Sequence, residues 1–204
     1  MKKLLVLTGL LCGMLICNYG YAQGFKGEGD KVFQAGLAAV RYPGNYFGHL
    51  SSTGFFPPVF MSFDYGIHDY VSIGAYSYLF SRSFAGNGWV DGHWGTNWRV
   101  RETWWGIGGR AAFHLTPFLN DVARTRIPEE LHLYGGVYLG LDNYFKSRNS
   151  DQRHYDSYYA GGPALGPMVG ARYFFTRGFG VYAEARADIF HTVSFATIGI
   201  SLKL

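Results

Sequence analysis

A serine and a histidine near the carboxyl end of the chain come nearest to the residue types and spacing of covalent catalysis. Ser194 follows His191 by three positions. A nucleophilic serine needs a base within hydrogen-bond reach and an acid that orients that base. We find no acidic residue that matches this requirement, and His191 is also suited to a tight turn. The sequence therefore predicts a protein that is not an enzyme, with catalysis at these two residues as the alternative.

The sequence contains no pattern typical of a metal site, a cofactor site or nucleic-acid binding. Its seven histidines are scattered, and its two cysteines are Cys12 and Cys17, so the ligands are not grouped as a metal site requires. No glycine-rich segment leads from a strand into a helix, as phosphate-binding loops do. The net charge of +4 falls by two if Lys2 and Lys3 leave with a leader peptide, which gives no basic footprint for nucleic acid.

Five charged residues fall on the polar side of an alternating pattern, where they can neutralise one another. They are Asp64, Arg110, Arg172, Glu184 and Arg186. In an enclosed interior, such charges form either an ion path or a buried network of salt bridges, because an unpaired buried charge is costly. We favour the structural network. Glu184 is expected beside Arg172, because a short turn joins the segments that carry them.

Tryptophans gather in one segment, FAGNGWVDGHWGTNWRVRETWW, which is expected to be an outer loop. Trp104 and Trp105 fit the aromatic girdle found at a membrane interface. Trp89, Trp94 and Trp98 lie further out. Exposed Trp side chains often anchor a partner, so these three are candidate partner-binding residues for a protein or a glycan. Packing of the loops on one another is the alternative.

The composition restricts the class of protein. Glycine accounts for 29 of the 204 residues, aromatic residues for 19% and charged residues for 16%. Disordered chains are poor in aromatic residues and rich in charge, and long helices need about half Ala, Glu, Lys, Leu and Arg. The length favours a single domain.

The first 22 residues are expected to be a secretory signal peptide. Lys2 and Lys3 precede a short apolar stretch from Leu4 to Ile16, and Gly20-Tyr21-Ala22 supplies the small residues of a cleavage site. The apolar stretch is shorter than the roughly 20 residues of a membrane-spanning helix. Cleavage after Ala22 would leave residues 23–204 without cysteine.

From Gly24 onward, the apolar pattern has a period of two, which is typical of strands. In the clearest segment, Val181, Ala183 and Ala185 alternate with Tyr182 and Glu184. Eight such segments are expected, near residues 31–41, 58–66, 70–82, 101–115, 130–144, 164–175, 178–190 and 193–204.

These strands fit either a soluble sandwich or lipocalin-like barrel or a transmembrane barrel with its apolar side toward lipid. The apolar faces carry no charged residue, the polar faces combine large aromatic residues with glycines, and the segments match the roughly 9–11 residues that cross a bilayer. We therefore predict an all-β, eight-stranded, antiparallel up-and-down transmembrane barrel over residues 23–204. We expect its interior to be filled by side chains and not to form an open pore. The aromatic residues expected to fill it are Tyr76, Tyr78, Trp104, Tyr134, Tyr138 and Tyr182.

The connections then fall on two sides of the membrane. Residues near 42–57, 83–100, 145–163 and 191–192 are expected to face outward, and those near 67–69, 116–129 and 176–177 to face the periplasm. Long outer loops and short periplasmic turns are typical of such barrels. The segment 116–129 is long for a periplasmic turn.

The hairpin PPVFMSFDYGIHDYVSIGAYSYLFSR, the final strand SFATIGISLKL and the leader peptide resemble the small eight-stranded OmpA/OmpX-like outer-membrane barrels. The resemblance covers residues 24–204 and rests on pattern and length. It departs from that family at the last residue, which is Leu204 where an aromatic residue is usual. The resemblance implies an integral protein of the Gram-negative outer membrane.

The expected function is therefore a non-enzymatic outer-membrane barrel with a structural, surface-interaction or accessory-subunit role. Its expected partners are outer-membrane lipid and lipopolysaccharide, with a protein or glycan at the outer loops. One alternative is a lipid-modifying enzyme similar to the lipid A deacylases, whose His-x-Ser-Asn motif is not matched by His191-Thr192-Val193-Ser194. A narrow channel is the other alternative.

Overall fold

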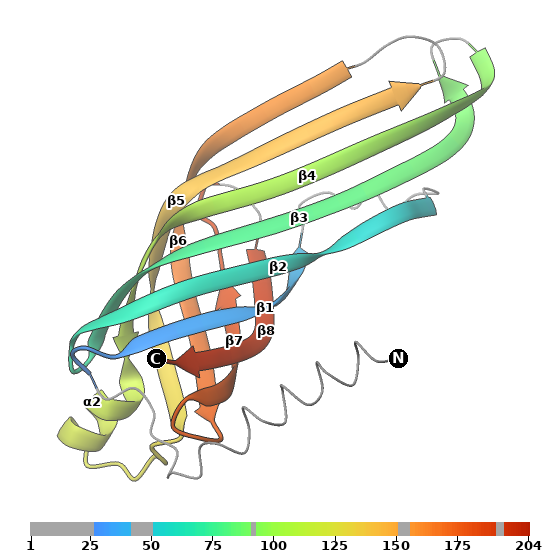
Figure 1. Ribbon diagram of the computed structural model, residues 1–204. Helices are drawn as coiled ribbons and strands as arrows, with labels where there is room; N and C mark the ends of the chain where they lie inside the picture. Colours follow the sequence, from blue (N-terminus) through green and yellow to red (C-terminus); the bar gives the residue numbers. More distant parts are fainter. Residues whose placement is uncertain (1–26, 42–50, 91–92, 151–155, 191–193) are drawn as a thin grey trace, which may run out of the picture.

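The computed structural model describes residues 27–41, 51–90, 93–150, 156–190 and 194–204. They form a closed barrel in which eight antiparallel strands are hydrogen-bonded in sequence order and β8 pairs with β1 (Figure 1). This confirms the predicted eight-stranded up-and-down topology. The predicted leader, residues 1–22, lies outside the described residues. The strands are β1 (Lys31–Arg41), β2 (Ser51–His68), β3 (Val71–Val90), β4 (His93–His114), β5 (Leu131–Ser150), β6 (Asp156–Phe174), β7 (Phe179–Arg186) and β8 (Ser194–Lys203).

Side chains alternate between a filled interior and an apolar outer surface. In β7, Tyr182, Glu184 and Arg186 are buried, whereas the residues between them face outward. The outer surface carries large apolar side chains, among them Leu139, which is 61% exposed, and Ile198, which is 69% exposed. An uncharged apolar belt around a closed barrel is the surface that a bilayer covers. The fold is therefore a transmembrane β-barrel.

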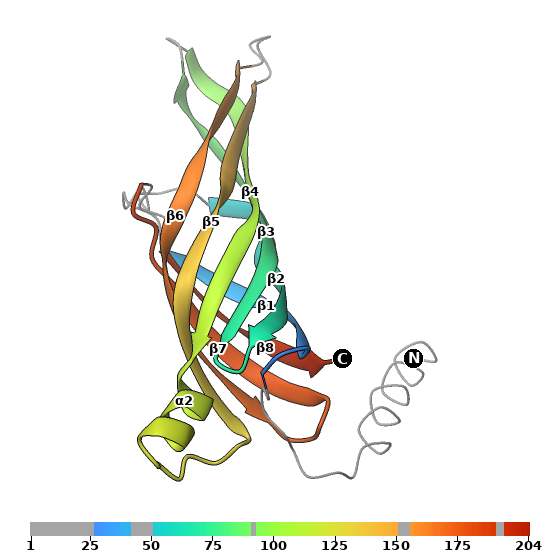
Figure 2. The same cartoon turned by 90° about the vertical axis from the view of Figure 1, so that its left-hand side faces the viewer.

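The strands differ greatly in length. Strands β2 to β6 have 18 to 22 residues, whereas β7 has 8, β8 has 10 and β1 has 11. We call the end with Lys31, Lys203 and the helix α2 (Leu115–Val122) the base, and the opposite end the top. Strands β3 to β6 rise well above their neighbours at the top (Figure 2).

This length corrects the predicted outer loops. Most of residues 83–100 and much of 145–163 belong to strands rather than to loops, because β3 stays paired with β4 as far as Val90 and His93, and β5 stays paired with β6 as far as Arg148 and Asp156. The prediction ended each strand where the apolar alternation stops, at clusters of Gly, Pro, Asn and Asp. A paired hairpin satisfies its own backbone hydrogen bonds, so it can continue beyond the apolar segment.

The helix α2 lies in the segment 116–129, where a long periplasmic turn was predicted. The ring of Phe118 in this helix contacts the rings of Tyr70 and Phe113, with ring centroids 5.7 and 5.3 Å apart. The Tyr70 hydroxyl donates a 3.0 Å hydrogen bond to Asp121, and this carboxylate raises the pKa of Tyr70. The helix was missed because it is short and Pro117, which the first turn tolerates, reads as a break. Among the described residues, no helix is long and apolar enough to cross a membrane.

The lipid-facing belt predicts that a charge is costly in the middle of β8 and tolerated near the base. Replacing Ile198 by Lys should destabilise the barrel by about 2–4 kcal/mol, and replacing Ile67, near the end of β2, by about 0–1 kcal/mol. Both side chains are exposed on the outer surface. Reversible unfolding from lipid vesicles, followed by heat-modifiable gel mobility, measures the difference. Equal losses at the two positions would contradict a lipid-facing belt.

Candidate functional site

A cluster of buried ions fills the lower part of the barrel interior. The carboxylate of Asp64 contacts Arg110, with 3.0 Å between Oδ1 and Nε, and also contacts Arg172. Glu184 accepts from Arg110 Nη2 at 2.8 Å and from Arg186 Nε at 2.6 Å. Each of these five side chains is at most 1% exposed. The structure thus brings together all five charged residues that the sequence analysis selected.

Neutral polar groups connect this ion cluster to the remaining strands. Tyr134 on β5 donates a 2.7 Å hydrogen bond to Glu184, and Gln34 on β1 accepts from both Ser62 and Arg172. The Gln34 amide also lies 3.4 Å from Ser201 on β8. Side chains from β1, β2, β4, β5, β6, β7 and β8 therefore take part, so the cluster spans the width of the interior.

The predicted pairing of Glu184 with Arg172 differs from the structure. Glu184 is in register with Gly170, and Arg172 with Tyr182, so the two charges are offset along the strands. The guanidinium of Arg172 instead reaches across the interior to Asp64 on β2, while Arg110, Arg186 and Tyr134 occupy the carboxylate of Glu184. A partner on the adjacent strand was expected, but the long Arg172 side chain pairs with Asp64 on the opposite side of the barrel.

Arg186 closes the ion cluster from above with a set of aromatic rings. Its guanidinium carbon lies 4.2 Å from the ring centre of Phe60, 4.5 Å from Tyr76, 5.2 Å from Tyr138 and 5.8 Å from Phe195. Cation–π attraction is stronger where water is excluded, so these rings offset the surplus of three arginines over two carboxylates. Ions and rings together fill the interior, as an eight-stranded barrel allows.

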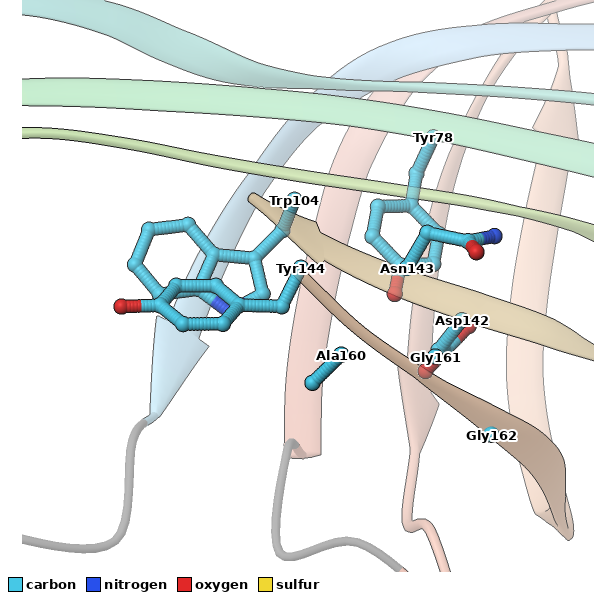
Figure 3. Close-up of a pocket in the computed structure, with 8 residues that line it drawn as sticks. All are labelled: Tyr78, Trp104, Asp142, Asn143, Tyr144, Ala160, Gly161 and Gly162. Carbon is cyan, nitrogen blue, oxygen red and sulfur yellow. The ribbon is translucent and has the colours of Figure 1, made fainter. Parts of the chain in front are cut away.

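A small cup lies above this filled part, on the inner side of β3 to β6. The strand register places two rows of residues across it: Phe80, Trp104, Tyr144 and Ala160 above, and Tyr78, Gly106, Asp142 and Gly162 below. Large and small side chains alternate along the lower row, which leaves space. The resulting cavity has a volume of about 130 Å³, and Figure 3 shows the residues that line it. We call it the aromatic cup; its lining residues are Tyr78, Trp104, Asp142, Asn143, Tyr144, Ala160, Gly161 and Gly162.

Contacts above the aromatic cup hold its rings in place. Trp104 stacks on Phe80 and lies against Tyr144, with centroids 5.2 and 4.7 Å apart. The Tyr144 hydroxyl donates a 3.0 Å hydrogen bond to Glu102, which also forms a 2.7 Å ion pair with Arg82. The Arg82 guanidinium lies 5.0 Å from the ring centre of Trp104. The rings are therefore preorganised by an ion pair on the adjacent row.

The sequence alone indicates part of this site. The alternating pattern is the signal. From it, we expected Tyr78 and Trp104 in the interior but did not select Asp142 or Tyr144 as candidate residues. Both lie on the polar face of a predicted strand, which was the available signal. Their meeting with Trp104 and Tyr78 depends on the register between neighbouring strands.

The remaining candidates lie elsewhere. The backbone of Trp89 belongs to β3 and that of Trp94 and Trp98 to β4, with Trp98 in register with Gly86; their side chains lie outside the described part of the structure. His191 is outside the described residues, and Ser194 begins β8. No group of three or more potential metal ligands occurs among the residues that the structure describes.

Comparison with known proteins identifies the fold but no family. No protein-family model matches the chain, and no curated protein matches it. Among solved structures, it is similar to Ail, the attachment invasion locus protein of Yersinia pestis, in complex with the heparin analogue sucrose octasulfate. That match has 14% identity and a TM-score of 0.54, and covers 87% of this chain and 99% of Ail.

The chain is also similar to the outer membrane protein OprG from Pseudomonas aeruginosa. The identity is 12% and the TM-score 0.54, and the match covers 90% of this chain and 99% of OprG. At this level of identity, the two matches show a shared fold. The chain has the eight-stranded architecture of small outer-membrane barrels.

The ion cluster predicts which charges depend on one another. Asp64→Asn and Arg172→Met should each destabilise the barrel by about 3–5 kcal/mol, because each leaves a buried charge without its partner. The double variant should recover part of the loss. Denaturant unfolding of the single and double variants measures the coupling energy. In the matched cycle, Glu184→Gln with Arg172→Met should be closer to additive, and stronger coupling there than between Asp64 and Arg172 would contradict the observed pairing.

Proposed function

We propose that the chain is exported by a signal peptide at residues 1–22 and acts in the Gram-negative outer membrane as a non-enzymatic surface-contact protein. The apolar belt and the fold shared with small outer-membrane barrels support this location. The base then faces the periplasm, and the top faces the outside. Lipopolysaccharide and outer-membrane lipid surround the belt.

The proposal is carried by a contrast within the barrel. Its interior is filled, whereas strands β3 to β6, which we call the wall, extend far above the filled part. The buried ion cluster leaves no room for transport through the lower interior. Above it, β3 to β6 continue as two tall hairpins (Figure 2). A barrel that only spanned the membrane would need strands of about 9–11 residues, whereas β4 has 22. The additional length supports a role outside the membrane.

The top of the wall carries groups suited to a negatively charged partner. Arg99 and Arg101 are exposed on β4, and Lys146 is in register with Glu102, which pairs with Arg82. The tryptophans at 89, 94 and 98 belong to the same pair of strands. Arginine forks match sulfate and carboxylate groups, and aromatic rings add contact area. Binding of a sulfated compound by the Ail protein is consistent with such a partner, so an anionic glycan is the partner class we favour.

The filled interior predicts that the purified barrel conducts no ions. Reconstituted in planar bilayers, it should give no stable single-channel steps, because the ion cluster and its aromatic cover occupy the lumen. Stable, reproducible open levels from the folded protein would contradict a contact role and favour the narrow-channel alternative.

We expect substitutions at the top of the wall to weaken glycan binding without unfolding the barrel. Replacing Trp89, Trp94 and Trp98 together by Ala should weaken binding of the folded protein to immobilised heparin at least tenfold, since aromatic anchors often contribute about 2 kcal/mol or more each. Replacing Arg99 and Arg101 by Ala should weaken the same binding and its dependence on salt.

The matched control replaces Arg124 and Arg126 by Ala, because these two arginines are exposed near the base. This variant should bind heparin as the natural chain does. Heat-modifiable gel mobility shows whether each variant is folded. Equal weakening by the base and top arginine variants would show that binding is not located at the top.

A further inference from the structure

The helix α2 lies at the base, at the end of the barrel opposite the proposed contact surface (Figure 1). We propose that α2 and the turn after it, residues 115–126, bind the head group of a phospholipid in the membrane leaflet around the base. We call this surface the foot. The inference goes beyond the proposed surface contact at the top and does not rest on it.

The foot lies on the lipid-facing side of the barrel rather than beneath its interior. At the end of β4, Ala112 and His114 are buried, so Phe113 between them faces outward. The ring of Phe118 in α2 packs against this outward ring, with 5.3 Å between the ring centroids. Its other neighbour is the ring of Tyr70, at 5.7 Å. The helix therefore continues the outer surface that a bilayer covers.

Aromatic side chains on the same outer surface indicate the depth of the foot. Exposed rings surround the base, among them Tyr65, Phe113, Tyr173 and Phe175. Aromatic girdles of this kind lie at the depth of the lipid head groups. Because Phe118 contacts one of these rings, α2 lies at the same depth, between the acyl chains and the water.

Apolar residues on one face of α2 extend the lipid-facing belt. Leu115, Phe118 and Val122 follow one another at intervals of three and four positions, which places them on the same face of a helix. Phe118 packs against the barrel, whereas Leu115 is 38% exposed and Val122 is 63% exposed. A helix that presents apolar side chains at this depth buries them at the boundary between head groups and acyl chains.

Two exposed arginines follow this apolar face directly. Arg124 and Arg126 come two and four positions after Val122. In the described part of the chain, neither of them forms an ion pair. A guanidinium group matches the geometry of phosphate oxygens and binds them through charge-assisted hydrogen bonds. Acyl chains against Val122 and a phosphate at the arginines are the two halves of a phospholipid.

Acidic residues of the same segment have other positions. The carboxylate of Asp121 accepts a 3.0 Å hydrogen bond from the hydroxyl of Tyr70. The backbone carbonyl of Glu130 accepts a 2.9 Å hydrogen bond from Phe174, so the end of the segment with Glu129 and Glu130 lies beside β6. The arginines follow the helix, and the two glutamates precede β5. The segment therefore separates its two signs of charge.

Arg124 occupies a backbone position that usually belongs to glycine. Its φ is 52°, and it follows Ala123, the last residue of the helix cap. Glycine or asparagine is usual at this position, because other side chains are strained there. Asn120 fixes the turn: its Oδ1 accepts from the hydroxyl of Thr125 at 2.9 Å and from the backbone of Ile127 at 3.0 Å. A strained arginine in a fixed turn indicates a function for its side chain.

The test uses this glycine position. A variant with Arg124→Gly and Arg126→Gln loses both cations but relieves the strain at residue 124, so it should fold and be at least as stable as the natural chain. Residues 23–204, folded in maltoside micelles, are titrated with dihexanoylphosphatidylglycerol or with uncharged dihexanoylglycerol, and native mass spectrometry measures the bound lipid. The variant should bind the phosphate lipid about tenfold more weakly. Binding of the uncharged lipid should not change, and Glu129→Gln should bind both lipids as the natural chain does.

A second measurement tests the position of the foot with both arginines retained. Residues 23–204 contain no cysteine, so Val122→Cys and Glu129→Cys each place one fluorescent probe. In vesicles whose phospholipids carry a nitroxide near the head group, the probe at residue 122 should be quenched more strongly than the probe at residue 129.

Three results would each overturn the proposal: equal quenching at the two positions, unchanged binding of the phosphate lipid by the arginine variant, or displacement of that lipid by an equal concentration of inorganic phosphate. Heparin binding is measured on the same arginine variant and should be unchanged, because that binding is proposed for the opposite end. Failure here is therefore distinguishable from failure of the surface contact.

Discussion

The pairing of two buried carboxylates with three arginines is the interaction on which the rest of this barrel depends. Asp64 and Glu184 lie in an interior without access to water, where an unpaired charge costs several kcal/mol. Their partners come from β4, β6 and β7. The cluster therefore fixes how the strands are placed relative to one another, and it fills the space through which a solute would pass. Under the proposed function, recognition takes place at the top of the barrel.

The arrangement of that top follows from side-chain size along each row. Where β4 places Gly106 between Tyr78 and Asp142, two large groups approach each other across a missing side chain. One row higher, Trp104 occupies the corresponding position and contacts rings on both neighbouring strands. The cup exists because a row with a gap lies beneath a row of stacked rings. The shape of this cavity arises from packing geometry as much as from the chemistry of any one residue.

Features that depend on the alternation of side chains along a strand could be predicted from the sequence. Features that depend on the register between strands could not. Period-two patterns separate the inner face of Tyr182 and Glu184 from the outer face of Ile198, and they locate all eight strands. The partner of Arg172 is set by how far the strands are offset around the barrel, which alternation does not encode. The aromatic cup needs the same information. The lengths of β2 to β6 were underestimated because the apolar alternation stops before the strands end, whereas β7 ends at Arg186, before the predicted residue 190. The helix α2 is too short for its periodicity to stand out.

Closure between β1 and β8 has a consequence for how the chain reaches its folded form. Val32 pairs with Lys203, and the backbone of Leu204 donates to Lys31, so the first and last strands depend on each other across almost the whole chain. Contacts between distant parts of a sequence slow folding. An amino-terminal strand that emerges first has no partner on one side until the last strand arrives. The barrel can therefore close only after β8 has been made, and until then the edge of β1 that pairs with β8 is open to aggregation.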